Sequence, residues 1–68
     1  MSKRWMNEAG WSVELVLRDG RGARLALSFR GEPRMTHYFD FWEVSRAVAE
    51  AESLAEAIGM EPVKVVTL

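Results

Sequence analysis

The sequence contains no cysteine, and its 68 residues include only one histidine and two prolines. Without cysteine the chain can form no disulfide, zinc–thiolate site or thiol nucleophile. No apolar run approaches the roughly 18 residues of a membrane span, and residues 1–10 lack the apolar core of a secretory signal. We therefore expect a cytoplasmic domain stabilised by packing alone or by a partner chain.

Residues suited to catalysis are equally scarce. His37 is the single histidine, which excludes a histidine metal cluster or a histidine–cysteine pair. Asp40 and Glu43 resemble paired carboxylates, but capping of a helix explains their spacing. The serines have no predicted base beside them, and the glycines near residues 20 and 31 fall in predicted hairpin turns. We expect no enzyme activity, no metal and no cofactor.

The charge of the chain is unevenly distributed. With 49% apolar and 28% charged residues and a net charge of -1, the composition is that of an ordinary globular protein. Residues 1–39 carry seven Lys/Arg against four Asp/Glu, whereas residues 40–68 carry two against six. The two segments therefore have net charges of +3 and -4. Arginine outnumbers lysine seven to two, which favours a bacterial or phage gene.

Alternating apolar and polar residues predict three strands in the first half of the chain, at 11–18, 23–30 and 34–39. Turn residues separate them at 19–22 and 31–33. Short turns of this kind join antiparallel neighbours. The sequence therefore predicts a three-stranded antiparallel meander.

The apolar residues of these strands occupy odd positions, so paired residue numbers must have an even sum if the apolar side chains share one face. Three-residue loops would then place Leu17 opposite Leu25, and Leu25 beside Phe39. The same register places Arg24 opposite Asp40.

A helix is predicted between Asp40 and Gly59. Asp40 and Glu43 form a capping box at its start, and Gly59 is a typical C-terminal stop. Apolar residues with helical spacing form one stripe, which we expect to be buried. The stripe consists of Val44, Ala47, Val48, Ala51, Leu54, Ala55 and Ile58.

The β-branched run at 63–68 predicts a final strand. A crossover through the helix would bring it parallel to the strand at 11–18 and beside it, in the order 3-2-1-4. The predicted class is α+β, a single βββαβ domain over residues 11–68. Residues 1–10 are expected to be flexible or loosely packed.

The βββαβ arrangement resembles, in topology alone, half of a ribonuclease H fold as it occurs without catalysis in the N-terminal part of HicB-type antitoxins. Residues 39–43 match no HicB signature, and no carboxylate cluster matches a ribonuclease H site. The resemblance therefore implies neither a family nor an activity.

One side of the predicted helix presents Trp42 with small residues and carboxylates. An aromatic anchor with a charged rim is typical of a protein-binding surface. The sequence predicts a regulatory or inhibitory protein that binds another protein, with a phage inhibitor such as an anti-CRISPR-like nucleic-acid mimic as one form. Alternatively, Trp5 or Met6 covers Trp42 and the glutamates only solvate the helix. The predicted surface comprises Trp42, Glu43, Arg46, Ala49, Glu50, Ser53 and Glu56.

The sheet face opposite the helix is predicted to be rich in arginine. Guanidinium groups with an aromatic platform suit a nucleic-acid-binding module, which is the alternative function. The simpler interpretation is a solvated polar face, which is common in antiparallel sheets. The residues concerned are Arg18, Arg24, Arg30, Arg34 and Tyr38.

The final strand has apolar residues in both phases. If it lies at an edge of the sheet, a homodimer would cover them, and packing around a curved sheet is the alternative. These residues are Val63, Val65, Val66 and Leu68.

Overall fold

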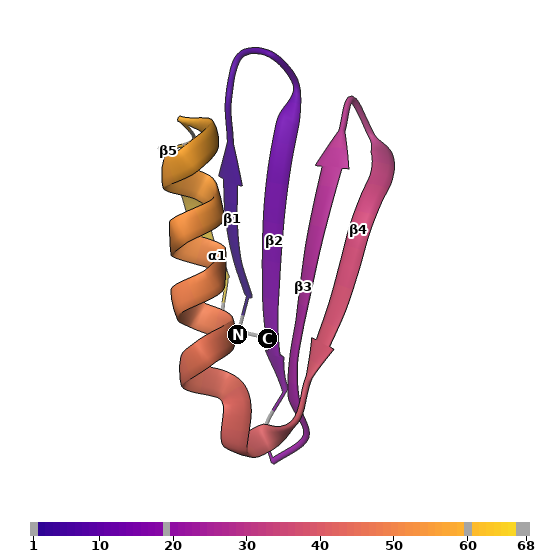
Figure 1. The fold of residues 1–68 in the computed structure, drawn as a ribbon. Helices are drawn as coiled ribbons and strands as arrows, with labels where there is room; N and C mark the ends of the chain where they lie inside the picture. Colours follow the sequence, from indigo (N-terminus) through magenta and orange to yellow (C-terminus); the bar gives the residue numbers. More distant parts are fainter. Residues whose placement is uncertain (1, 19, 60, 67–68) are drawn as a thin grey trace.

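The computed structural model describes residues 2–18 and 20–59, and the backbone of residues 61–66. It shows an α+β domain in which one helix lies against one face of an antiparallel sheet (Figure 1). The strands are β1 (Ser2–Met6), β2 (Trp11–Arg18), β3 (Gly22–Phe29), β4 (Glu32–Phe39) and β5 (Glu61–Val66). A 3-10 turn, η1 (Phe41–Glu43), and the helix α1 (Val44–Ile58) connect β4 to β5.

The strand order across the sheet is β4-β3-β2-β1-β5, and every neighbouring pair is antiparallel. The predicted α+β class is confirmed, and the four predicted strands keep their relative order. The last strand does not lie beside β2 as expected, because β1 occupies that edge of β2 and itself pairs with β5. The fold therefore has one strand more than βββαβ.

β1 replaces the flexible segment that we expected at residues 1–10. Its Trp5 is only 4% exposed and lies opposite Val13 of β2. The hairpin loop is closed by Asn7, whose backbone N–H donates to the Trp11 carbonyl at 3.1 Å and whose Oδ1 accepts from the Trp11 N–H at 3.0 Å. Burial of one large aromatic ring fixes the strand in place.

The register of the meander differs by two residues from the prediction. Leu15, rather than Leu17, pairs with Leu25, and Leu25 pairs with His37 rather than Phe39. A shift of two residues preserves the side-chain phase, so the apolar positions still share one face as predicted.

Gly22 explains this register. It pairs with Arg18 and so belongs to β3, whereas the prediction placed it in the hairpin loop. Its φ of +104° suits glycine, and a Cβ at this position would collide with the carbonyl oxygen of Phe39. The start of β3 can therefore lie against the end of β4.

β4 contains an irregularity that the sequence did not indicate. Leu27 pairs with Met35, but the next β3 residue, Ser28, pairs with Pro33. Arg34 is thus the extra residue of a β-bulge, which changes the direction of the side chains on one side of it.

The helical segment lies between the predicted capping residues, but its first turn, η1, is a 3-10 turn, so that α1 itself begins only at Val44, with Glu43 as its N-cap. Asp40 is the N-cap of the first turn, and its backbone N–H donates to Glu43 Oε1 at 3.4 Å. Gly59 adopts a left-handed conformation with φ of 74°, and its N–H reaches the Ala55 and Glu56 carbonyls. These caps satisfy backbone groups that helix ends otherwise leave unpaired.

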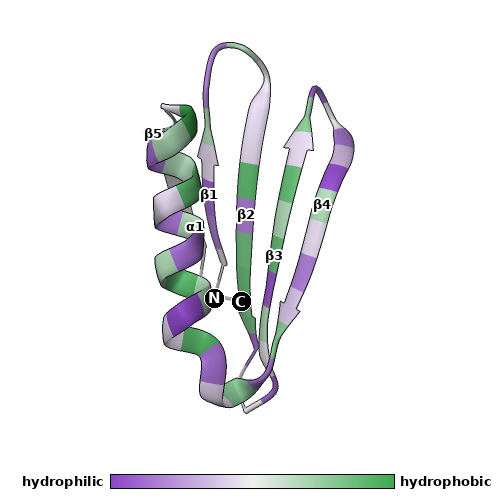
Figure 2. Cartoon of the chain, in the orientation of Figure 1, coloured by the Kyte–Doolittle hydropathy of each residue, from purple (hydrophilic) through white to green (hydrophobic). Residues whose placement is uncertain are grey.

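α1 packs on β2 and β3, while β4 lies at the far edge of the sheet from the helix in Figure 1. Ala47, Ala51 and Ala55 are buried in its contact face, which confirms the centre of the predicted stripe. Figure 2 shows hydrophilic and hydrophobic residues alternating along the helix. The buried core consists of Trp5, Val13, Leu15, Ala23, Leu25, Phe39, Ala47, Ala51 and Ala55.

Candidate functional site

Two exposed aromatic side chains mark the start of the helix. Phe41 and Trp42 are 62% and 69% exposed, and their rings meet edge to face with centroids 5.0 Å apart. Trp5 is buried in the core and so does not cover Trp42, contrary to one of the alternatives considered above. The preceding Phe39 is only 5% exposed and fixes this turn to the sheet. Phe41 and Trp42 are called the aromatic pair below.

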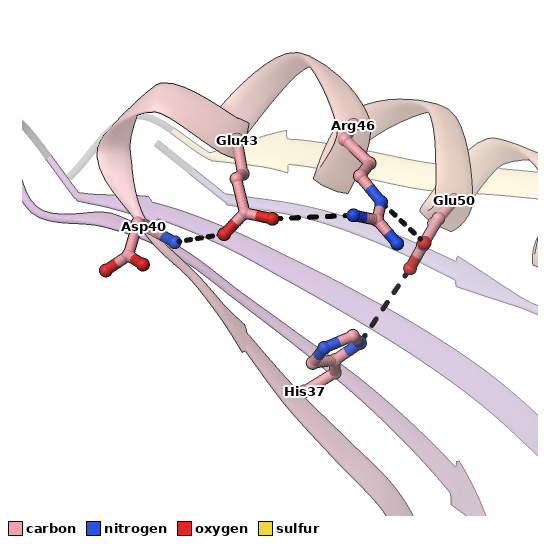
Figure 3. A network of polar contacts seen from close by, with 5 residues as sticks. All are labelled: His37, Asp40, Glu43, Arg46 and Glu50. Carbon is pink, nitrogen blue, oxygen red and sulfur yellow. Dashed lines mark hydrogen bonds and ion pairs between the residues drawn. The ribbon is translucent and has the colours of Figure 1, made fainter.

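A chain of polar contacts runs from this turn along the helix (Figure 3). Arg46 lies between two glutamates, with Nη1 3.5 Å from Glu43 Oε2 and Nε 3.3 Å from Glu50 Oε1. The other Glu50 oxygen lies 3.8 Å from His37 Nδ1 on β4. These groups are substantially exposed, so each contact contributes at most about 1 kcal/mol. Together these contacts hold the polar side chains on the side of the helix that faces β4.

The rest of the predicted helix surface is open to solvent. Ala49, Ser53 and Glu56 are exposed and continue the side of the helix that begins at Trp42. Within residues 2–18 and 20–59, neither Glu52 nor Glu56 forms an ion pair, whereas Arg46 contacts both Glu43 and Glu50. The uncompensated negative charge of the helix therefore lies toward its C-terminal half.

A shallow groove adjoins this side of the helix, between α1 and the β3–β4 hairpin. Its volume is about 330 Å³, and its exposed surface is mainly apolar. The sequence did not predict the groove. The groove forms only where β4 extends past the helix and is not packed against it. Its walls are formed by Leu25, Met35, Glu50, Ser53, Leu54 and Ala57.

On the opposite face of the sheet, Glu14 joins two arginines from neighbouring strands. Glu14 Oε2 accepts from Arg4 Nη2 and Glu14 Oε1 from Arg24 Nη2, both at 2.8 Å. Arg24 was expected to lie opposite Asp40, but the two-residue change of register places it opposite Tyr38 instead. The Nε of Arg24 is buried and has no hydrogen-bond partner.

The five residues of the predicted nucleic-acid face do not form one surface. The guanidinium groups of Arg30 and Arg34 lie over the Phe29 ring, 5.2 and 5.8 Å from its centroid. Phe29 packs 4.6 Å from Trp11, on the face of the sheet that carries the helix. Arg34 departs from the prediction because the bulge interrupts the strand alternation on which its predicted placement depended.

The other three predicted residues do come together. Arg18, Arg24 and Tyr38 line a hollow of about 170 Å³ at the end of the sheet near the start of the helix. Arg21, which the sequence did not single out, and Asp40 also line it. Arg21 belongs to a turn, so no strand periodicity could have assigned it to a face.

The described segments contain no group of three or more His, Asp or Glu side chains placed to hold a metal ion. Within the same parts of the chain, no helix is both long and apolar enough to cross a bilayer. The proposed dimer contacts at Val63, Val65, Val66 and Leu68 lie outside the residues whose side chains are described; the backbone of β5 does form an edge strand.

Comparison of the chain with protein-family models, curated proteins and solved structures found no match. The case for a function therefore depends on the geometry of the surfaces described above.

Proposed function

We propose that this domain is a regulatory or inhibitory protein that acts by binding another protein, with the aromatic pair as its anchor. The observation that carries the proposal is the exposure of Phe41 and Trp42, 62% and 69%, on a turn fixed by the N-cap of the helix. Adjacent exposed aromatic rings of this size are typical of interaction sites rather than of an ordinary solvated surface.

The rigidity of the turn supports this role. The buried Phe39 precedes the aromatic pair, and Glu43 caps the turn just after it. A ring held in place before binding loses little conformational freedom when a partner covers it. Truncation of a fully buried aromatic anchor costs about 2 kcal/mol or more of binding free energy, which corresponds to roughly thirtyfold in affinity.

Charge indicates the chemistry of the partner. Residues 40–59 contain five carboxylates and a single arginine, for a net charge of -4. We infer an apolar pocket on the partner that receives Trp42, with lysine or arginine around it to face Glu52 and Glu56. The apolar groove beside Glu50 and Ser53 would extend the contact area.

The aromatic pair favours this mode of binding over mimicry of a nucleic acid. A mimic would present a row of free carboxylates, but Arg46 contacts two of the helix glutamates. The proposed contact therefore depends on the rings, and the remaining charges of the helix select the partner and its orientation.

The experiment is affinity capture from cells of the source organism with the wild-type chain and with the double variant Phe41→Ser/Trp42→Ser. Met6→Ser is the matched control, because Met6 is a large apolar residue of β1 that is 43% exposed and belongs to neither the aromatic pair nor the groove. We expect the wild type and the control to retain one common protein that the double variant fails to retain. Retention of that protein by the double variant, with the fold intact by circular dichroism, would overturn the proposal.

A further inference from the structure

We propose that the hollow formed by Arg18, Arg21, Arg24 and Tyr38 binds a nucleotide, either free or within a single strand. Its phosphate group would contact the three guanidinium groups, and its base would stack on Tyr38. Arg18, Arg21, Arg24 and Tyr38 are not part of the protein-binding surface, although Asp40, which also lines the hollow, directly precedes Phe41.

Three elements bring the positive charges together. Arg18 ends β2, Arg21 lies in the turn that follows, and Arg24 is near the start of β3. All three line one hollow of about 170 Å³, and among the described residues Asp40 contributes a carboxylate to its lining. Asp40 serves as the N-cap of the first helical turn. An anionic group in the hollow would balance this local excess of positive charge.

The arginines are available to a ligand. Within the described ranges of the chain, Arg18 and Arg21 form no ion pair, and the contact of Arg24 with Glu14 uses only one of its terminal nitrogens. The Arg24 side chain as a whole remains 36% exposed. Guanidinium groups are also the side chains best matched to phosphate oxygens.

Tyr38 extends the site from a phosphate to a nucleotide. It lies directly across from Arg24 in the sheet, and its side chain is 70% exposed at the rim of the hollow. An exposed aromatic ring beside a cluster of arginines is the combination that binds single-stranded nucleic acids, because every base can stack on it. Double-stranded DNA presents no free base face to such a ring.

The test measures two ligands on the intact chain: thymidine 5′-monophosphate by calorimetry, and a fluorescently labelled short oligothymidylate by anisotropy at low and physiological salt. Binding of both would identify a free nucleotide as sufficient, whereas binding of the oligonucleotide alone would identify a single strand as the ligand. Either outcome supports the site. Absence of binding by both at low salt would overturn it.

Variants then locate the binding. Arg18→Gln/Arg21→Gln should weaken binding at least about tenfold, and the slope of log affinity against log salt should fall by about 0.7 for each phosphate that is no longer neutralised. Arg30→Gln/Arg34→Gln removes the same charge from the other end of the sheet and should change the affinity by less than about threefold, since those side chains lie over Phe29. Equal reductions in affinity for both double variants would show attraction by net charge alone and would overturn the site.

Tyr38 provides the specific readout for the base. Tyr38→Ala should weaken oligothymidylate binding by about fivefold or more, whereas Tyr38→Phe should retain it, because stacking needs the ring and not the hydroxyl. Equal affinity of the wild type and the alanine variant would contradict the stacking role.

Discussion

Trp5 of β1 lies opposite Val13 of β2, and both side chains are buried, with exposures of 4% and 0%. The N-terminal strand is thus part of the hydrophobic core. Because β1 also lies between β2 and β5, the position of the last strand depends on it.

Replacement of Trp5 with alanine should destabilise the domain severely. Loss of a buried tryptophan typically costs about 3–5 kcal/mol, which is a large fraction of the stability of a small domain. Trp42→Ala is a matched control, because this ring is 69% exposed and should change the free energy of unfolding by less than about 0.5 kcal/mol. Urea unfolding followed by circular dichroism measures both. If Trp5→Ala does not fold, Trp5→Phe should still show a smaller decrease in stability, and equal stability of the two alanine variants would refute the role of β1.

Gly22→Ala should cost more stability than Gly20→Ala. Both glycines have positive φ, so each substitution carries a backbone penalty of about 1 kcal/mol. Only at Gly22 does the new methyl group also meet the carbonyl of Phe39; at Gly20 no atom of the described residues beyond its chain neighbours lies within 4 Å of it. Thermal unfolding of the two variants tests this, and an equal decrease in melting temperature would show that the close approach of β3 to β4 has no energetic role.

The buried alanines of α1 predict a contrast between two leucine substitutions. Ala51→Leu adds atoms between the helix and the sheet and should cost about 1–3 kcal/mol, since overpacking forces displaced side chains. Ala49→Leu places the same group on the exposed side of the same helix and should be nearly neutral. Denaturant midpoints give the comparison, and a neutral Ala51→Leu would indicate that the helix does not approach the sheet as closely as the structure shows.

Glu14→Gln should weaken the link between Arg4 and Arg24 across the central strand. Both arginines would be deprived of a charged acceptor, and we expect a decrease in stability of about 1 kcal/mol at low salt that becomes smaller at high salt. Glu52→Gln is the control, because this carboxylate is exposed and forms no ion pair with any described residue. An effect independent of salt would argue against an electrostatic origin.

Local signals in the sequence were sufficient for the helix. Asp40, Glu43 and Gly59 specify its ends through contacts within a few residues, and the apolar spacing specifies its buried side. Trp42 is exposed, as helical spacing predicted, although it lies with Phe41 in the 3-10 turn η1. Phe41 was missed as its partner because helical spacing aligns position 41 with the buried stripe, and that spacing does not hold in a 3-10 turn.

Features that depend on distant segments could not be predicted in the same way. Alternation fixed which residues of the meander share a face, but the absolute register depends on the contact of Gly22 with Phe39. The bulge at Arg34 and the convergence of Arg18 with Tyr38 likewise arise only when separate strands pair. In β1 only Trp5 is buried, and one buried residue in five is too few to give a recognisable strand pattern in the sequence.

The position of β1 between β2 and β5 also has a consequence for local opening of the sheet. If β5 separates from β1, the outer backbone of β1 loses its hydrogen-bond partners while β1 stays paired with β2. The strand edge exposed in this way is a site at which two copies of the chain can pair. Pairing with β5 therefore protects this protein from aggregation through β1.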